Sequence, residues 1–327
     1  MNSGVSNLQR FLDSVTPIVP STTLHQSHFH EINLPWHPPS TETVKYFKLK
    51  DLWDSYKEWS AFGACTRVVF SSGEAVKKYF VPHLSAIQIY TNKSLLPSSV
   101  KSEVSSNSTV EFESDAWSDD SGSDKLSGSP SNSSSKAWDN MSDDSNLDPA
   151  VSLHARERFG HIYLEFFESC SPNWRVPMMD KINELAKDRP ALMTLRSMDL
   201  SPASWMAIAW YPIYHIPNVG SKGLSTCFLT YHTLSSAFLD NGKELELDDE
   251  TETLKGTCPV DRADEEISLS PFGLATYKMQ GDLWVNPLVT PEYLKFINLQ
   301  NAAHSWLKQL NVNHPDLSFF THHHSAS

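Results

Sequence analysis

Residues 205–216 read WMAIAWYPIYHI and are apolar at both odd and even positions. Successive side chains of a β-strand point to opposite faces, so this pattern predicts a strand that is buried on both sides. Pro212 interrupts the stretch and cannot donate a hydrogen bond to a neighbouring strand. We therefore expect a bulge or an edge position at Pro212.

Other strand-like runs lie on both sides of this stretch. They are residues 67–70, 84–90, 159–168, 225–232 and 274–285, with a last short one near 317–320. Helical spacing of apolar residues and helix-capping signals predict helices after Ser6, over 51–63, over 177–190 and from Thr290 to Leu310. A His- and Pro-rich loop is expected over 21–43. Strands and helices do not alternate regularly, which predicts an α+β fold: a single domain with a mostly antiparallel mixed sheet packed by a few helices.

Two acidic segments hold most of the charge of the chain. The 327 residues carry a net charge of −13: residues 100–150 contribute −8, residues 240–266 contribute −8, and the rest of the chain contributes +3. From about 96 to 153 periodicity disappears and Ser, Asp, Asn and Gly dominate. Such a composition buries too little apolar surface to offset the cost of ordering the chain. We expect a disordered insertion over 96–153, globular parts over 1–95 and 154–327, and a flexible acidic loop over 240–267.

The charge balance also limits the partners of the chain. Outside the two acidic segments the net charge is only +3, which disfavours the basic surface that nucleic-acid binding needs. The apolar run 205–216 is too short to span a bilayer, and residues 1–7 lack the features of a secretory signal. Four scattered cysteines suit a reducing compartment. We expect a soluble protein of the cytosol, the nucleus or both.

One group of aromatic and polar residues could line a ligand pocket. Its members are Trp210, Tyr211, Tyr214, His215 and His232. Aromatic side chains dominate protein cores in general, so a packed core is the alternative interpretation. The polar atoms of Tyr211, Tyr214 and His215 need partners if they are buried, and a cavity where they converge would be the candidate site.

Catalytic and metal-binding motifs give no positive signal. Cys227 and His232 are five residues apart, which places them on opposite faces of a regular strand, so a thiol–imidazole pair would need a bulge and a buried Cys227 is favoured. The histidines at 25, 28, 30 and 37 lack partners at metal-ligand spacing. No phosphate-binding loop, nucleophile elbow or zinc-protease motif occurs. We assign no catalytic residue, metal or cofactor.

The acidic insertion contains serines placed directly before carboxylates or proline. Ser118, Ser121 and Ser142 precede acidic residues closely, and Ser129 precedes Pro130. Phosphorylation at such a site would add about 1.5–2 units of negative charge. The insertion is thus interpreted either as a regulated electrostatic element or as a neutral spacer.

Several longer motifs resemble one known family. They are SNLQRFL at 6–12, DLWDSYKEWSAFG at 51–63, LRS at 195–197, DLSP at 199–202, AWYPIYHIP at 209–217, FLTYHTLS at 228–235 and FGLATYK at 272–278. Together they are similar to a plant family known only as a domain of unknown function (number 789). The likeness covers nearly the whole chain apart from the two acidic segments and implies a plant source. It implies no activity, cofactor or catalytic residue.

Two functions follow as expectations. The first is a non-enzymatic interaction or regulatory protein that binds other proteins and is tuned by phosphorylation of its acidic segments. The alternative is an enzyme or a small-molecule-binding protein with a pocket near the aromatic strand 205–216. The sequence determines neither the identity of a partner nor the oligomeric state.

Overall fold

The computed structural model describes residues 5–25, 36, 43–92, 159–213, 222–239, 265–279, 281–285 and 290–322. These residues belong to one compact unit, made of 1–95 and 150–327. The insertion expected over 96–153 and most of the acidic loop expected over 240–267 lie outside the described residues. The described part is an α+β fold with antiparallel strand pairing throughout, as the sequence predicts.

The main sheet has six strands, in the order β3-β4-β6-β7-β9, with β5 also paired to β4. The strands are β3 Ala64–Val69, β4 Ala75–Thr91, β5 His161–Phe167, β6 Trp205–Pro212, β7 Cys227–Thr233 and β9 Gly273–Tyr277. The 17-residue β4 is long enough to pair with β3 near its start, with β5 near its end and with β6 on its other side. The doubly buried stretch around 205–212 is therefore β6, in the middle of the sheet.

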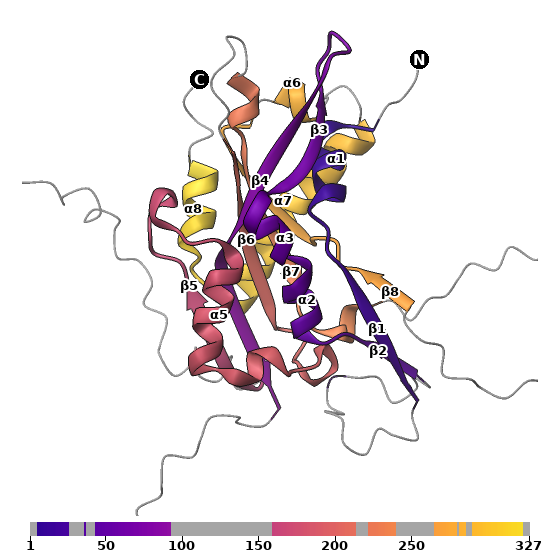
Figure 1. The fold of residues 1–327 in the computed structure, drawn as a ribbon, viewed down its shortest axis with the longest axis vertical. Helices are drawn as coiled ribbons and strands as arrows, with labels where there is room; N and C mark the ends of the chain where they lie inside the picture. The colour runs from indigo at the N-terminus through magenta and orange to yellow at the C-terminus, as the bar shows by residue number, and fades with distance from the viewer. Residues whose placement is uncertain are drawn as a thin grey trace, which may run out of the picture. The chain divides into compact units, whose positions relative to one another are not determined.

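Helices cover the two faces of this sheet separately (Figure 1). One face packs against α1 Asn7–Ser14, α2 Leu49–Ser55, α3 Lys57–Phe62, α5 Met178–Asp188 and α6 Gly281–Trp284. The other face packs mainly against α7 Thr290–Leu310 and α8 Pro315–His322. A strand between two helical layers must be apolar at both odd and even positions. This explains why β6 has apolar residues at successive positions.

A smaller three-stranded sheet has the order β2-β1-β8. Its strands are β1 Ile18–His25, β2 Thr43–Tyr46 and β8 Glu265–Ser268. The loop expected from residue 21 is therefore wrong over 21–25, which form the second half of β1. Pro20 lies in the half of β1 that pairs with β8, at residues 18–21, whereas β2 pairs with residues 22–25; a proline is tolerated where a strand is paired on one side.

Pro212 takes the edge position that the sequence predicts as one of two options: it pairs with Phe80 of β4 and lies beyond Trp210, where the described pairing of β6 with β7 stops. Two further expectations are corrected by the structure. The end of the strand-like run 274–285 is helix α6, and residues 317–320 are not a strand but part of α8. The short apolar run LSFF fits either period, and Pro315 with Asp316 in the first turn is the signal of a helix start.

Local sequence features explain where α1 begins and where α3 ends. The side chain of Ser6 accepts a hydrogen bond from the backbone N–H of Gln9 at 3.2 Å and caps α1, as the sequence predicts. Gly63 ends α3 with φ of +81°, a conformation that other residues rarely adopt. A Cβ atom at Gly63 would also lie 3.1 Å from the Cβ of Tyr79, so glycine fits this position for two reasons.

Candidate functional site

The start of α8 brings a cluster of polar side chains against the main sheet. The cluster consists of Ser85 on β4, Arg175 after β5, Tyr231 on β7, and His314 and Asp316 at the beginning of α8. We call these five residues the polar cluster. All of them except Arg175 are buried as whole residues, and the side chain of Arg175 is only 5% exposed. Such a buried group of titratable side chains is the strongest candidate for a functional site in the described part of the chain.

Ser85 lies in a β-bulge of β4. The register between β4 and β6 shifts between Leu84 and Ala86, so Ser85 is the extra residue. Leu84 packs on the side of α1, whereas Ala86 packs on the side of α8. The Ser85 hydroxyl also faces α8, where it contacts both His314 and Asp316, so the bulge lets two successive residues of β4 face the same side.

A turn between two helices positions His314 and Asp316. Asn311 follows α7 with φ of +51°, and the N–H groups of Val312 and Asn311 donate to the carbonyls of Leu307 and Lys308 at 2.9 and 3.1 Å. This is a Schellman motif, with asparagine at the position that glycine usually takes. It ends α7 and lets α8 begin a few residues later, with Asp316 in its first turn.

The ion pair between Arg175 and Asp316 is the centre of the cluster. The guanidinium donates two hydrogen bonds to the carboxylate, at 2.6 and 2.7 Å, and the two side chains are 5% and 7% exposed. The same guanidinium donates to the hydroxyl of Tyr211 at 3.1 Å and to the carbonyl of Cys170 at 2.9 Å. Burial acts against the charge of Arg175, but the hydrogen bonds to Asp316 and its negative charge raise the pKa of Arg175.

The direction of the hydrogen bonds excludes an activated serine. The Ser85 hydroxyl donates its proton to Asp316, so it can only accept from Nε2 of His314, which lies 2.9 Å away. Nδ1 of His314 then accepts from the hydroxyl of Tyr231 at 2.8 Å. A nucleophilic serine needs a histidine that accepts its proton, and here the histidine donates to the serine. The cluster thus contains a serine, a histidine and an aspartate, as a hydrolase triad does, but its hydrogen bonds run in directions that do not activate the serine.

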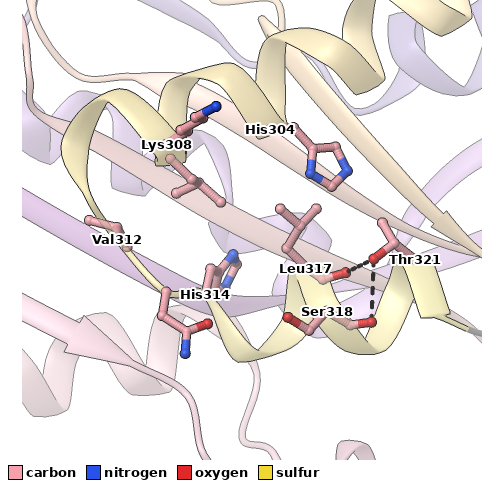
Figure 2. A pocket seen from close by; sticks show the side chains of 9 residues that line it. His304, Lys308, Val312, His314, Leu317, Ser318 and Thr321 are labelled. Atoms are coloured by element: carbon pink, nitrogen blue, oxygen red, sulfur yellow. Dashed lines mark hydrogen bonds between the residues drawn. The ribbon is translucent and has the colours of Figure 1, made fainter. Parts of the chain in front are cut away.

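A shallow cleft lies next to the cluster, between α7 and α8 (Figure 2). It has a volume of about 270 Å³, and its lining includes His304, Lys308, Ser318 and Thr321 together with His314. Both ring nitrogens of His314 already bond to Ser85 and Tyr231, and the Thr321 hydroxyl donates to the carbonyl of Leu317 at 2.8 Å. The cleft therefore offers a ligand the exposed polar side chains of His304, Lys308 and Asn313.

The residues of the predicted pocket do not share one face of the sheet. Trp210 and His232 point to the side of α1, where both bond to the hydroxyl of Thr230, at 2.9 and 3.0 Å. Tyr211 points to the side of α8 and bonds to Arg175. Tyr214 and His215 lie outside the described residues. The structure thus brings Trp210 and His232 together in the core and joins Tyr211 to the polar cluster.

Cys227 and His232 lie on opposite faces of β7, as their spacing predicts. Cys227 packs on the side of α8, and burial raises the pKa of its thiol to about 12. A thiol with this pKa is protonated at neutral pH and is a poor nucleophile. Of the four histidines considered as metal ligands only His25 is described, and the described part of the chain holds no group of three or more His, Cys, Asp or Glu residues that could bind a metal ion.

Sequence reasoning missed all five members of the cluster: Ser85, Arg175, Tyr231, His314 and Asp316. One signal was available, because His314-Pro315-Asp316 has the form of a helix N-terminus with a buried acid. The bulge at Ser85 and the approach of Arg175 leave no mark in the local sequence. The four phosphorylation candidates, Ser118, Ser121, Ser129 and Ser142, lie outside the described residues. No helix of the described part is long and apolar enough to cross a membrane.

Two buried histidines make stability depend on pH. Burial lowers the pKa of both His232 and His314 to about 4, against about 6.5 in an unfolded chain. Below about pH 6.5 the unfolded chain binds protons that the folded chain excludes, so the free energy of unfolding falls as the pH falls. We expect a loss of about 1.4 kcal/mol per pH unit for each histidine between about pH 6 and pH 4.5.

Urea unfolding at several pH values measures this dependence. The variant His232→Gln keeps a polar side chain and removes one titrating group, so its stability should fall less steeply with pH than that of the wild type. Equal slopes in the two proteins would contradict a neutral, buried His232.

Comparison with known proteins gives one match. The model of a family described as "Protein of unknown function (DUF789)" matches residues 6–320. This range includes the whole polar cluster. No curated protein and no solved structure matches the chain.

Proposed function

The chain belongs to this family of unknown function, and from that premise we propose that it is a non-enzymatic protein that binds other proteins through the loop carrying Trp174. The observation that carries the proposal is the 81% exposure of Trp174 on a loop that is fixed on both sides. Exposed tryptophans are rare on soluble proteins and are the residue type most enriched at binding hot spots.

The loop around Trp174 is held in place by its neighbours in sequence. Trp174 ends a short 3₁₀ turn, η3 Pro172–Trp174, and its N–H donates to the carbonyl of Ser171 at 3.0 Å. Arg175 follows and is fixed by Asp316 and by the carbonyl of Cys170. The carbonyl of Val176 accepts from Nδ1 of His83 at 2.8 Å. A loop whose backbone is already positioned loses little conformational entropy on binding, which supports a role in recognition.

The polar cluster supports the same proposal. Its hydrogen bonds satisfy each other, its serine is not activated, and its ion pair fixes the position of the Trp174 loop. A structural role for the cluster accounts for these features without a chemical reaction. Regulation by phosphorylation of Ser118, Ser121, Ser129 or Ser142, and a location in the cytosol or nucleus of a plant cell, are parts of the proposal.

Comparison of Trp174→Ala with the wild type tests the proposal. Both full-length proteins would be used for affinity purification from a plant extract, followed by quantitative mass spectrometry and by affinity measurement with the partner recovered. We expect Trp174→Ala to weaken binding by about 30-fold or more, as the loss of a hot-spot residue does. Its free energy of unfolding should change by less than about 0.5 kcal/mol, because the side chain is exposed.

Phe62→Ala is the matched control. Phe62 is an aromatic residue at the end of α3 that is 70% exposed, and its removal should leave binding unchanged. Partners retained equally by the wild type and Trp174→Ala would refute the proposal. A ligand screen of the alternative, a small-molecule site near β6, would then be the next experiment.

A further inference from the structure

A small pocket lined by aromatic rings lies beside α7. It has a volume of about 260 Å³, and four of its nine lining residues are Trp36, Phe159, Phe238 and Trp306. None of the nine lining residues is charged. The volume is slightly below that of sites for drug-sized molecules, and an uncharged, mostly apolar lining suits a small neutral molecule.

Part of the wall is fixed by packing, and part of it is exposed. Gly160 has φ of +98° and lies directly against Trp36, because a Cβ atom built on Gly160 would meet the Trp36 ring at 3.1 Å and the carbonyl oxygen of Thr91 at 2.7 Å. Phe238, in contrast, is 55% exposed and meets Trp306 edge to face at 6.2 Å between ring centroids. The ring of Phe238 can therefore turn outward without opening the core.

The indole N–H of Trp306 is an unusual group for such a pocket. Its nitrogen is buried, and within the described part of the chain it has no hydrogen-bond partner. The buried indoles of Trp53, Trp205 and Trp210 all donate to oxygen atoms, at 2.8 or 2.9 Å. A buried polar group without a partner is rare in a folded protein and indicates that an acceptor is supplied from elsewhere.

An oxygen on an apolar molecule satisfies this N–H better than the alternatives do. The rings of Phe238 and Phe272 lie 6.2 and 5.1 Å from the Trp306 ring between centroids, but the face of an aromatic ring is a weak acceptor. A bound water needs about two to four polar partners, and the side chains of this lining are mostly apolar. A molecule with one acceptor and a flat apolar body matches both the donor and the rings.

We propose that the aromatic pocket binds a small, neutral, flat molecule that carries a carbonyl oxygen. The flat body packs among the aromatic rings, and the oxygen accepts a hydrogen bond from Nε1 of Trp306. The ligand reaches this nitrogen as the exposed Phe238 ring turns outward, a side-chain change of the kind that is common on binding. The proposal goes beyond protein binding by the Trp174 loop and involves other residues, so either one can fail without the other.

Two probe molecules of nearly the same shape test the proposal. Acetophenone is a flat aromatic ketone, and α-methylstyrene has a CH₂ group in place of the carbonyl oxygen. Each is titrated into the full-length chain labelled with nitrogen-15, and the indole N–H signals are followed by NMR. We expect acetophenone to bind with a dissociation constant on the order of 1 mM and to shift the Trp306 signal. The exposed Trp174 provides the control signal, which should not shift.

The hydrocarbon probe measures the contribution of the oxygen. We expect α-methylstyrene to bind about three- to tenfold more weakly than acetophenone, because it leaves the Trp306 N–H without an acceptor. Benzoate, a charged molecule of similar size, should also bind more weakly than acetophenone, because the carboxylate loses its hydration in a pocket without a cation.

The variant Trp306→Phe removes the N–H and keeps an aromatic ring. It also assigns the Trp306 signal, which disappears from its spectrum. Measured on the ligand signals, its affinity for acetophenone should fall about three- to tenfold, to that of α-methylstyrene, whose own binding should stay the same. Trp174→Phe is the matched control and should bind both probes as the wild type does. Circular dichroism checks that both variants are folded.

Four results would overturn the proposal. Absence of acetophenone binding would mean that the pocket takes no such ligand, and binding that leaves the Trp306 signal unshifted would place the probe elsewhere. Equal affinity for the ketone and the hydrocarbon would remove the role of the N–H, and tighter binding of benzoate would make the ligand an anion. If Trp306→Phe does not fold, the comparison of the three probes on the wild-type chain still decides.

Discussion

Arg175→Ala is expected to lower the free energy of unfolding by about 3–5 kcal/mol, because it leaves the buried carboxylate of Asp316 without its cation. The Asp316 side chain is 7% exposed and receives two hydrogen bonds from Arg175. Its other side-chain donor is Ser85, which cannot neutralise a charge. Urea unfolding followed by circular dichroism measures the loss.

Two further variants separate the effect of charge from that of packing. Arg175→Lys keeps the charge but not the planar fork, so its loss should be intermediate. The double variant Arg175→Met, Asp316→Leu removes both charges and should recover much of the stability, because well-packed apolar pairs replace buried ion pairs at little cost. If the double variant is as unstable as Arg175→Ala, the uncompensated charge is not the cause of the loss.

The same substitution connects stability with the proposed function. Arg175 is the residue that follows Trp174, and its contacts with Asp316 and Cys170 fix the loop. Arg175→Ala should therefore weaken partner binding even under conditions where the rest of the domain stays folded. The double variant should restore stability without restoring this binding, since the hydrogen bond from Arg175 to the carbonyl of Cys170 is also lost.

Phe11→Ala is expected to cost about 3–5 kcal/mol, the usual range for removing a buried aromatic side chain from a core. Phe11 on α1 is completely buried. Its ring stacks on Phe228 at 3.9 Å between centroids and meets the rings of Phe80 and Trp284 at 5.1 and 6.4 Å. Removing it leaves a cavity between α1 and the sheet that these rigid rings cannot fill.

Phe62→Ala is again the control, since it removes the same side chain from a position that is 70% exposed. Its free energy of unfolding should stay within about 0.5 kcal/mol of the wild type. A small loss for Phe11→Ala, close to that of Phe62→Ala, would mean that α1 contributes little to the core and that the aromatic packing beneath it is not essential.

Much of the fold could be predicted from short stretches of sequence. Apolar residues at both parities identified β6, the hydroxyl of Ser6 identified the start of α1, and Gly63 the end of α3. These signals are local: a period of two, a cap and a positive φ each depend on a few consecutive residues. Two helices were expected as strand, α6 at the end of the run 274–285 and α8 at 317–320, because short apolar runs fit both periods.

The candidate site could not be predicted in the same way. Ser85, Arg175, Tyr231 and His314 come from four separate parts of the chain, and no local pattern links them. The bulge at Ser85 breaks the alternation of β4, because Ser85 and the next residue, Ala86, both face the side of α8, so strict periodicity cannot describe both ends of the strand. Trp210 and Tyr211 were both assigned to the predicted pocket, but they lie on opposite faces of the sheet. Neighbouring residues of a strand point to opposite sides, so the two cannot line one pocket.

The sequence by itself thus determined the fold class, the doubly buried strand, the helix ends near Ser6 and Gly63 and the concentration of negative charge in two segments. Only the tertiary structure decided that an arginine after β5 neutralises an aspartate in α8, and that Trp174 is exposed while the other described tryptophans are largely covered. The reason is physical: the burial of a side chain and the partner of a charge depend on contacts between residues far apart in the chain, whereas caps and periodicity depend on neighbours.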